Sequence, residues 1–516
     1  MDGAPLIPRL VVAGTSSGVG KTTVMVALTR AFQARGLKVA TFKCGPDYLD
    51  PSYHARTSGA PCHNLDGWLM GRDAVVSTFR HASQGHDVAL IEGVMGLYDG
   101  ASPDSEEGSA AQVAKWLAAP VLAVVDVSGM ARTIAAIGTG LAAFDPELKV
   151  AGLFANRVGS RSHLELLQRA ARGTAVPVVG GLPAQESLAF PERHLGLLTA
   201  SEESIPSGHF DAWGTLLAEW NDPEAFLRLA REAPALPEAP EEDRSDAPVT
   251  CRIAVAQDAA FHFYYADNLR RLERLGAQCV PFSPLSDEAL PPDVHAVYLG
   301  GGYPELHAQR LADNQSLRRA LSDFAARGGP IYAECGGMMY LSQAIRTLEG
   351  QDFPMVGLVP GVAVMAPKLQ ALGYVEVETT VRTVLGGAGL RFRGHQFRYS
   401  TLEGVPEQGE CCASASVVAA PSIPRVLARP TCWPPTSTPT GPPTPWSPRD
   451  SWLRRGPSRS NGHDGRPGHA GGGSAVPGGR REGARGALRP SARRPLVGPP
   501  QRGPPACPGG GVAAGA

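Results

Sequence analysis

The sequence predicts an α/β protein with two doubly wound parallel-sheet domains and a disordered C-terminal tail. Short apolar runs alternate with amphipathic stretches in two separate regions, which is typical of parallel sheets with helices on both faces. A Pro-, Ala- and acid-rich stretch separates the two regions, and a Pro-, Gly- and Arg-rich stretch ends the chain. We therefore expect domains at 8–231 and 250–411, a linker at 232–249 and a low-complexity tail at 412–516.

Composition limits the classes of function. The 516 residues carry a formal net charge of −1, which gives no basis for broad electrostatic binding to nucleic acid or to an anionic membrane. Residues 1–8 are short and polar, and the sequence has neither a signal peptide nor an apolar run of membrane-spanning length. The nine cysteines are scattered without a C-x-x-C pair, as is typical of reduced thiols. We therefore expect a cytoplasmic enzyme.

A glycine-rich segment after the first apolar run predicts a nucleotide phosphate site. Residues 13–23 read AGTSSGVGKTT, with an apolar run before them and an amphipathic stretch after them. This order predicts a strand, a turn and a helix whose backbone N–H groups bind a polyphosphate. The motif departs from G-x-x-x-x-G-K-[ST] at its first glycine, since Thr15 stands there and Gly14 precedes it. The expected ATP-binding residues are Gly18, Gly20, Lys21, Thr22 and Thr23.

Acidic residues follow the next two predicted strands, at the edge where parallel sheets bind their ligands. Asp47 and Asp50 follow the second strand, and Glu92 ends the third strand, with Asp99 in the loop after it. Magnesium prefers carboxylates together with phosphate oxygens, so Thr22, Asp47 and Glu92 are the expected metal ligands. A capped turn without a ligand is the alternative interpretation of Asp47 and Asp50.

Five motifs in this region resemble those of the cobyrinic acid a,c-diamide synthases of corrin biosynthesis. They are residues 14–22 (GTSSGVGKT), 43–51 (KCGPDYLDP), 92–100 (EGVMGLYDG), 125–130 (VDVSGM) and 156–160 (NRVGS). Cobyric acid synthases and dethiobiotin synthetases share the first motif, but the second motif favours the diamide synthases. In this resemblance, the residues expected to position the corrinoid are Tyr48, Asp50 and Asp99.

A second centre is predicted where residues 330–341 (PIYAECGGMMYL) place a cysteine between a strand and a helix. The pattern predicts a nucleophile elbow, in which the helix N-terminus lowers the pKa of the Cys335 thiol. The candidate oxyanion or turn glycines are Gly301, Gly302 and Gly336. These stretches and residues 394–400 (GHQFRYS) resemble the class I glutamine amidotransferase domain that is fused to the synthases. A buried structural cysteine in a glycine-rich turn is the alternative interpretation.

The resemblance also implies a general base that the C-terminal stretch does not supply. The family has a Ser-Tyr-x-His-x-His segment near its C-terminus, and nothing like it follows Ser400. His395 is the candidate substitute base, although it belongs to a family segment of its own. We therefore expect the glutaminase activity of this chain to be impaired.

Residues 429–443 indicate why that segment is missing. They read RPTCWPPTSTPTGPP, and the first two bases of every Thr and Pro codon are fixed. In a shifted frame these doublets become the second and third bases of a codon, and that frame can spell D-V-L-A-S-Y-V-H-P-H-W-A-S. We interpret residues 412–516 as the product of a shifted reading frame, with a disordered basic extension as the alternative.

The sequence thus predicts a ligase that uses ATP, Mg²⁺ and L-glutamine to amidate the a and c acetate groups of cobyrinic or hydrogenobyrinic acid. Two other functions stay open, namely amidation of another tetrapyrrole or acid and a non-enzymatic P-loop switch of the ParA type. The expected partners are the corrinoid acid and L-glutamine, without nucleic acid or membrane. A homodimer is left open.

Overall fold

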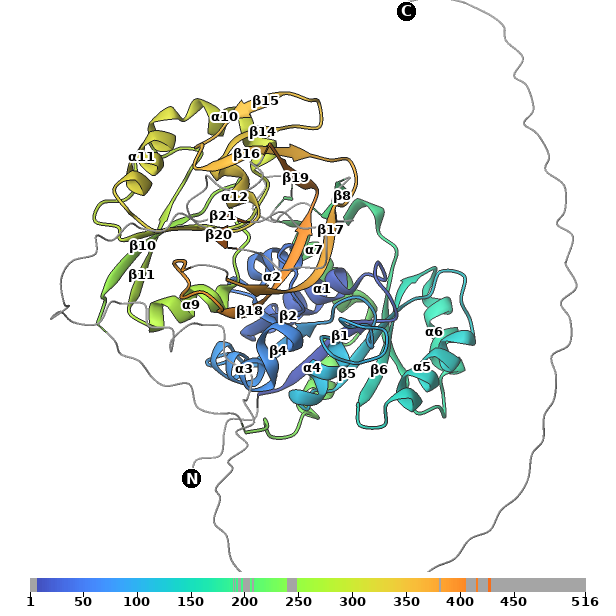
Figure 1. The fold of residues 1–516 in the computed structure, drawn as a ribbon. Coiled ribbons are helices and arrows are strands. Elements are labelled where there is room, and N and C mark those ends of the chain that lie inside the picture. The colour runs from blue at the N-terminus through green and yellow to red at the C-terminus, as the bar shows by residue number, and fades with distance from the viewer. Residues whose placement is uncertain are drawn as a thin grey trace, which may run out of the picture. The chain divides into compact units, whose positions relative to one another are not determined.

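The computed structural model of this chain contains two α/β domains in sequence (Figure 1). It describes residues 7–188, 190, 192–193, 196–197, 205–206, 208–238, 248–379, 382–404, 414–415 and 426–427. Both domains belong to one compact unit, Met1–Gly456. The expected tail lies outside the described residues, apart from the short strands β20 (Ser414–Ala415) and β21 (Val426–Leu427).

The first domain is built on a parallel sheet. Among the described residues this sheet has seven strands in the order β3-β2-β4-β1-β5-β6-β7. The strands are β1 (Arg9–Gly14), β2 (Val39–Cys44), β3 (His63–Leu65), β4 (Val88–Glu92), β5 (Val121–Asp126), β6 (Val150–Val158) and β7 (Val178–Pro183). Because β4 lies between β1 and β2, the carboxyl ends of these three strands meet at one edge of the sheet.

Helices cover both faces of this sheet (Figure 1). Successive strand residues point to opposite faces, so Val11 packs into one core cluster and Leu10 and Val12 into the other. The cluster around Val11 includes residues of α3 (Gly67–Ala82), α4 (Ala110–Trp116), α5 (Thr133–Phe144) and α6 (Arg161–Ala170). The other cluster includes residues of α1 (Lys21–Gln33), α2 (Leu49–Ser58), α7 (Gly208–Trp220) and α8 (Pro223–Arg231). The short elements η1 (Glu186–Leu188), β8 (Glu192–Arg193) and β9 (Gly196–Leu197) lie between β7 and α7.

The first part of the expected linker packs on the first domain. The guanidinium of the fully buried Arg9 donates a hydrogen bond of 2.7 Å to the carbonyl of Pro234. Arg80 donates one of 3.0 Å to the carbonyl of Pro237. The chain therefore stays in contact with the first domain as far as Pro237, although Pro234, Ala235 and Glu238 are exposed. Residues 239–247 lie outside the described residues.

The second domain combines a parallel sheet with a smaller mixed sheet. The parallel sheet has the order β11-β10-β12-β13, and the mixed sheet has the order β15-β14-β16-β19. The strands are β10 (Cys251–Ala256), β11 (Ala277–Phe282), β12 (Ala296–Leu299), β13 (Ile331–Ala333), β14 (Ser342–Arg346), β15 (Asp352–Pro354), β16 (Val359–Met365) and β19 (Ser400–Glu403). The helices are α9 (Ala266–Arg274), η2 (Pro304–His307), α10 (Ala308–Asp313), α11 (Gln315–Ala326) and α12 (Gly336–Leu341). In the part of the chain that the structure describes, no helix is both long and apolar enough to cross a membrane.

A hairpin of the second domain contacts the first domain. It consists of β17 (Ala371–Glu378) and β18 (Arg391–Arg398), paired antiparallel. The hydroxyl of Tyr374 donates to Oδ2 of Asp66 at 2.8 Å, and its ring centre lies 4.6 Å from that of Trp68. The Arg393 guanidinium lies 4.6 Å from the centre of the Trp68 ring and donates to its carbonyl at 2.7 Å. Polar and aromatic contacts thus join the two domains.

Candidate functional site

The loop between β1 and α1 is shaped by close contacts that require glycine. Gly20 has φ +93°, and a Cβ there would lie 2.2 Å from Nδ2 of Asn156. Nδ2 of Asn156 donates a hydrogen bond of 2.8 Å to the carbonyl of Val19, so the end of β6 fixes the loop. At the start of the loop, a Cβ on Gly14 would lie 2.6 Å from the Val19 side chain. At the start of the loop, Gly14 is therefore the residue with no room for a side chain. It lies one place before the usual first glycine of the phosphate-loop motif.

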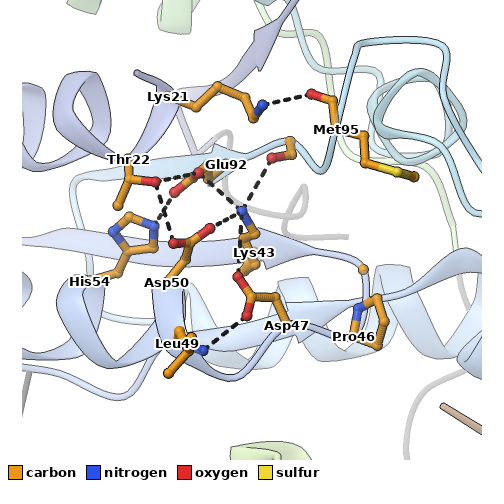
Figure 2. A network of polar contacts seen from close by, with 12 residues as sticks. Lys21, Thr22, Lys43, Pro46, Asp47, Leu49, Asp50, His54, Glu92 and Met95 are labelled. Carbon is orange, nitrogen blue, oxygen red and sulfur yellow. Dashed lines mark hydrogen bonds and ion pairs between the residues drawn. The ribbon is translucent and has the colours of Figure 1, made fainter. Parts of the chain in front are cut away.

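Lys21 begins α1, and its ammonium group lies inside this loop. Its Nζ donates a hydrogen bond of 2.6 Å to the carbonyl of Met95 (Figure 2). A second hydrogen bond, of 3.0 Å, goes to the carbonyl of Ser16. The residue is only 7% exposed, and burial is the main cause that lowers the pKa of Lys21. Met95 has φ 46°, an uncommon conformation for a residue other than glycine. A polyphosphate in the loop would offer this ammonium anionic oxygens in place of two carbonyls.

Carboxylates from the second strand-to-helix connection and from β4 converge on Thr22 and Lys43 (Figure 2). The Thr22 hydroxyl donates to Oε1 of Glu92 at 3.0 Å and lies 3.4 Å from Oδ1 of Asp50. Nζ of Lys43 lies 3.0 Å from that Glu92 oxygen, 2.5 Å from Oδ2 of Asp50 and 4.0 Å from Oδ2 of Asp47. Strand register explains the meeting, because Lys43 on β2 lies opposite Glu92 on β4.

Glu92 also contacts a fully buried histidine. Nε2 of His54 pairs with Oε2 of Glu92, the oxygen that faces away from Thr22 and Lys43. His54 and Asp50 are four residues apart on α2, so one face of this helix supplies both side chains. Nδ1 of His54 is buried and has no hydrogen-bond partner among the described residues. Both oxygens of Glu92 are therefore engaged in the ligand-free protein.

The two aspartates of this network differ in pKa. Burial, followed by the charge of Asp50, raises the pKa of Asp47 to about 7. Burial also opposes ionisation of Asp50, but the ammonium of Lys43 and the side-chain hydrogen bonds with Asp47 and Lys43 together lower the pKa of Asp50. Burial acts against the charge of Lys43 too, yet Asp50 and Glu92 raise the pKa of Lys43 well above its ordinary value. At neutral pH Lys43 and Asp50 are charged, whereas Asp47 is close to its midpoint.

Of the three residues expected to bind a metal at this edge of the sheet, two are in contact and the third lies apart from them. Thr22 and Glu92 are in direct contact, and the aspartate within reach of Thr22 is Asp50. Asp47 lies on the far side of the Lys43 ammonium, and its Oδ1 accepts from the backbone N–H of Leu49 at 3.0 Å. The expected metal set of Thr22, Asp47 and Glu92 therefore stays a prediction.

Two residues of the network had no predicted role. Lys43 opens the KCGPDYLDP motif, and His54 lies three residues after it. A lysine at the end of an apolar strand, followed by two aspartates, was the available signal for Lys43. The sequence gave no comparable signal for His54, because its role depends on the pairing with Glu92 from a distant strand.

Tyr48 and Asp99 have structural partners of their own. The Tyr48 ring stacks on Tyr265 and Phe263 of the second domain, with ring centres 4.5 and 5.1 Å apart. The hydroxyl of Tyr265 donates to the carbonyl of Pro46 at 2.8 Å. The loop that carries Asp47, directly before α2 with Asp50, thus touches the second domain. Oδ2 of Asp99 accepts from the backbone N–H of Gly96 at 2.8 Å, and the proposed contacts of Asp99 and Tyr48 with a corrinoid stay predictions.

The second centre has the strand, turn and helix order of the predicted elbow. Cys335 lies between β13 and α12 with φ 47° and ψ −110°, a strained backbone conformation. The backbone N–H groups of Gly302 and Gly336 form hydrogen bonds with its thiol. The carbonyl of Gly301 accepts from the N–H of Phe263 at 3.0 Å, so this glycine also belongs to the loop that contacts Tyr48. Two of the three candidate glycines thus present N–H groups at the sulfur.

The prediction that the helix N-terminus lowers the pKa of the Cys335 thiol is wrong. Cys335 is exposed at the surface, yet desolvation by the protein around it raises the pKa of its thiol to about 11. The charge of Glu305 adds to the rise, and the N–H groups of Gly302 and Gly336 offset only part of it. α12 spans only six residues, and desolvation outweighs the N–H groups at its N-terminus. The thiol is therefore protonated at neutral pH.

Alkylation of Cys335 by iodoacetamide should be slow at pH 7 and rise steeply toward pH 10. A raised pKa means that the thiolate fraction grows about tenfold with each pH unit below 11. Mass spectrometry of the peptide that contains residue 335 gives the rate, with Cys335→Ser as the blank. A rate that levels off between pH 7 and 8 would contradict the raised pKa.

His395, the candidate substitute base, lies on β18 opposite Tyr374. The two ring centres are 5.5 Å apart, and burial lowers the pKa of His395 to about 4. Among the described residues no contact joins His395 to Cys335, and Tyr374 faces Asp66 of the first domain. The role of His395 as a base stays a prediction that this geometry does not support.

Comparison with protein families agrees with the two sites. Residues 10–197 match the CobQ/CobB/MinD/ParA nucleotide binding domain, and residues 252–417 match the CobB/CobQ-like glutamine amidotransferase domain. Fold and sites together define a two-domain protein that joins a P-loop nucleotide-binding domain to a glutamine amidotransferase domain.

Individual relatives narrow the class. The cobyrinate a,c-diamide synthase of Leptospira interrogans is 54% identical over 397 residues, which cover 77% of this chain and 87% of that protein. The enzyme of the same name from Syntrophotalea carbinolica is 47% identical over 394 residues, 76% of this chain and 86% of that protein. The one from Dehalococcoides mccartyi is 45% identical over 400 residues, 77% of this chain and 86% of that protein. The chain belongs to the cobyrinate a,c-diamide synthase family.

Proposed function

We propose that this protein is a glutamine-using ligase that amidates the a and c acetate groups of cobyrinic acid, or of its cobalt-free form, in cobalamin biosynthesis. The observation that carries the proposal is the 54% identity over 397 residues to a cobyrinate a,c-diamide synthase. Matches to a nucleotide-binding domain and to a glutamine amidotransferase domain support ATP as the energy source and glutamine as the nitrogen donor.

In the ligase domain, a substrate carboxylate oxygen attacks the γ-phosphorus of ATP, and the bond to the leaving ADP oxygen breaks. Ammonia then attacks the acyl phosphate, inorganic phosphate leaves, and the new amide nitrogen loses a proton. Lys21 and the N-terminus of α1 offset the negative charge of the transferring phosphoryl group. Corrinoid positioning is assigned to Tyr48, Asp50 and Asp99.

The oxygen donors at this site suit magnesium. Thr22, Asp47 and Glu92 are the proposed ligands, and Asp50 is a further candidate because it lies 3.4 Å from the Thr22 hydroxyl. Hard oxygen donors of this kind are those that Mg²⁺ prefers, and the ion would neutralise phosphate charge. His54 holds the second oxygen of Glu92 and so fixes the direction in which that carboxylate points.

In the second domain, Sγ of Cys335 attacks the side-chain amide carbon of glutamine. A thioester forms as the C–N bond breaks and ammonia leaves with an added proton, and water then releases glutamate. The N–H groups of Gly302 and Gly336 are suited to stabilise the oxyanion of this reaction. Ammonia passes to the ligase domain, whose Tyr48 loop touches the loop that binds Gly301.

Cys335→Ala tests this division of labour. With cobyrinic acid, ATP and ammonium salts, the variant should amidate at the parent rate, because free ammonia bypasses only the thioester chemistry. With glutamine it should lose the residual activity that the parent chain retains without the expected general base. Mass spectrometry of the corrinoid counts the carboxyl groups converted to amides, and other tetrapyrrole acids serve as competing substrates. Failure of the parent chain to amidate cobyrinic acid with ammonium would rule out the proposed substrate.

A further inference from the structure

Lys43 occupies the centre of the carboxylate cluster. Its side chain is 3% exposed, and its ammonium reaches Glu92 at 3.0 Å, Asp50 at 2.5 Å and Asp47 at 4.0 Å. A fourth acceptor, the carbonyl of Gly93, lies at 3.3 Å. The protein thus supplies its own cation at the point where these oxygens converge.

The same oxygens are the ones that a metal ion at Thr22 would need. Oε1 of Glu92 accepts from both Thr22 and Lys43, each at 3.0 Å. A divalent ion bound to that oxygen would lie within a few Å of the ammonium, and like charges at such a distance disfavour each other. Since protein encloses Lys43, water screens this repulsion poorly.

A nucleotide polyphosphate changes this balance. It brings several negative charges, which can accept from Lys43 and from Lys21 while the metal takes the carboxylate oxygens. The two lysines are close enough that the charge of Lys43 contributes to the lowered pKa of Lys21. An anion between them therefore relieves a repulsion that is built into the ligand-free protein.

We propose that Lys43 makes metal binding depend on the nucleotide. Its ammonium neutralises the carboxylates of the ligand-free protein, so a divalent cation binds only together with a nucleotide polyphosphate. This inference rests on the proposed ATP site but not on the corrinoid substrate. It makes Lys43 a specificity-determining residue of the ligase domain.

Titration of the full chain with Mn²⁺, followed by electron paramagnetic resonance, tests the wild-type protein. Without nucleotide, the site should take up Mn²⁺ at least about tenfold more weakly than with a non-hydrolysable ATP analogue, since a neighbouring charge shifts such equilibria by a factor of ten or more. Glu92→Gln identifies which part of the signal belongs to this site. Equal affinity with and without the analogue would overturn the proposal.

Lys43→Met should remove the requirement for nucleotide. Mn²⁺ alone should then bind one ion per chain at least about tenfold more tightly than in the wild type, because three carboxylates lose their internal counter-ion. Adding Glu92→Gln to this variant should abolish the gain. Lys149→Met is the matched control, since this exposed lysine pairs only with Glu232 at 2.8 Å among the described contacts and its loss should not alter Mn²⁺ binding.

If Lys43→Met is too unstable for the titration, thermal unfolding gives a second measure of Mn²⁺ binding. A ligand that binds the folded state raises Tm, so Mn²⁺ alone should raise the Tm of this variant and leave that of the wild type unchanged. The role of Lys43 would be refuted if Mn²⁺ left the Tm of Lys43→Met unchanged and the wild-type protein bound Mn²⁺ without nucleotide. None of these readouts uses a corrinoid, so a chain that fails to amidate cobyrinic acid but shows this pattern refutes only the proposed substrate.

Discussion

Replacing Lys21 with alanine should abolish ATP-dependent amidation with glutamine and with ammonium alike. The ammonium of Lys21 lies inside the phosphate loop, and its loss removes a charge that acts on the transferring phosphoryl group. We expect turnover to fall by roughly 10²- to 10³-fold or more, the usual cost of removing one electrostatic stabiliser of a transition state. ADP release measured with saturating cobyrinic acid and ammonium salts gives the effect.

Two comparisons make the Lys21 result specific. Lys149→Ala removes the same charge from an exposed position and should retain full activity. Glutamate release from glutamine, measured without ATP, should be the same in Lys21→Ala and in the parent chain, because Cys335 lies in the other domain. Near-normal amidation by Lys21→Ala would exclude the loop before α1 as the site of phosphoryl transfer.

Restoring the alternative reading frame near Cys412 should raise glutamine hydrolysis by about 10²- to 10⁴-fold, the usual contribution of a positioned general base. The sequence as given has Cys335 but no Tyr-x-His-x-His segment, and residues 429–443 can encode one in the shifted frame. With its pKa raised to about 11, the thiol of this chain needs such a base to become a nucleophile at neutral pH. Glutamate release by the two proteins measures the difference.

Ammonium-dependent amidation should be similar in the two proteins, because the frame change leaves the first domain untouched. Cys335→Ala in the frame-restored protein should return glutamate release to the level of the blank. If the 516-residue chain hydrolyses glutamine as fast as the frame-restored protein, both the frameshift interpretation and the missing base are wrong. His395→Ala in the 516-residue chain then shows whether that histidine is the base.

The parts of the fold and site that depend on local patterns could be predicted from the sequence. The phosphate loop is one continuous segment, and parallel topology explains why the ends of β2 and β4 bring Asp50 and Glu92 to it. The contacts of Lys43 and His54 with Glu92 could not be predicted, because they depend on the register of β2 against β4 and on how α2 packs against the sheet.

The thiol shows a second limit of local patterns. A cysteine before a helix predicts a lowered pKa, but the pKa of the thiol depends on everything that surrounds the sulfur. Desolvation by the packed second domain and the charge of Glu305, thirty residues before Cys335, reverse the direction. These effects of burial and of distant charges on the pKa depend on the tertiary structure, which the local sequence pattern does not give.

Anchoring of the linker on the first domain limits how far the two domains can separate. The chain is held at Pro234 and Pro237, and β10 begins at Cys251. Even fully extended, the residues between Pro237 and Cys251 span roughly 45–50 Å at 3.3–3.6 Å each. So short a tether holds the domains at an effective concentration on the order of millimolar. At such a concentration, contacts such as those of Tyr374 and Tyr48 need little affinity of their own to hold the domains together.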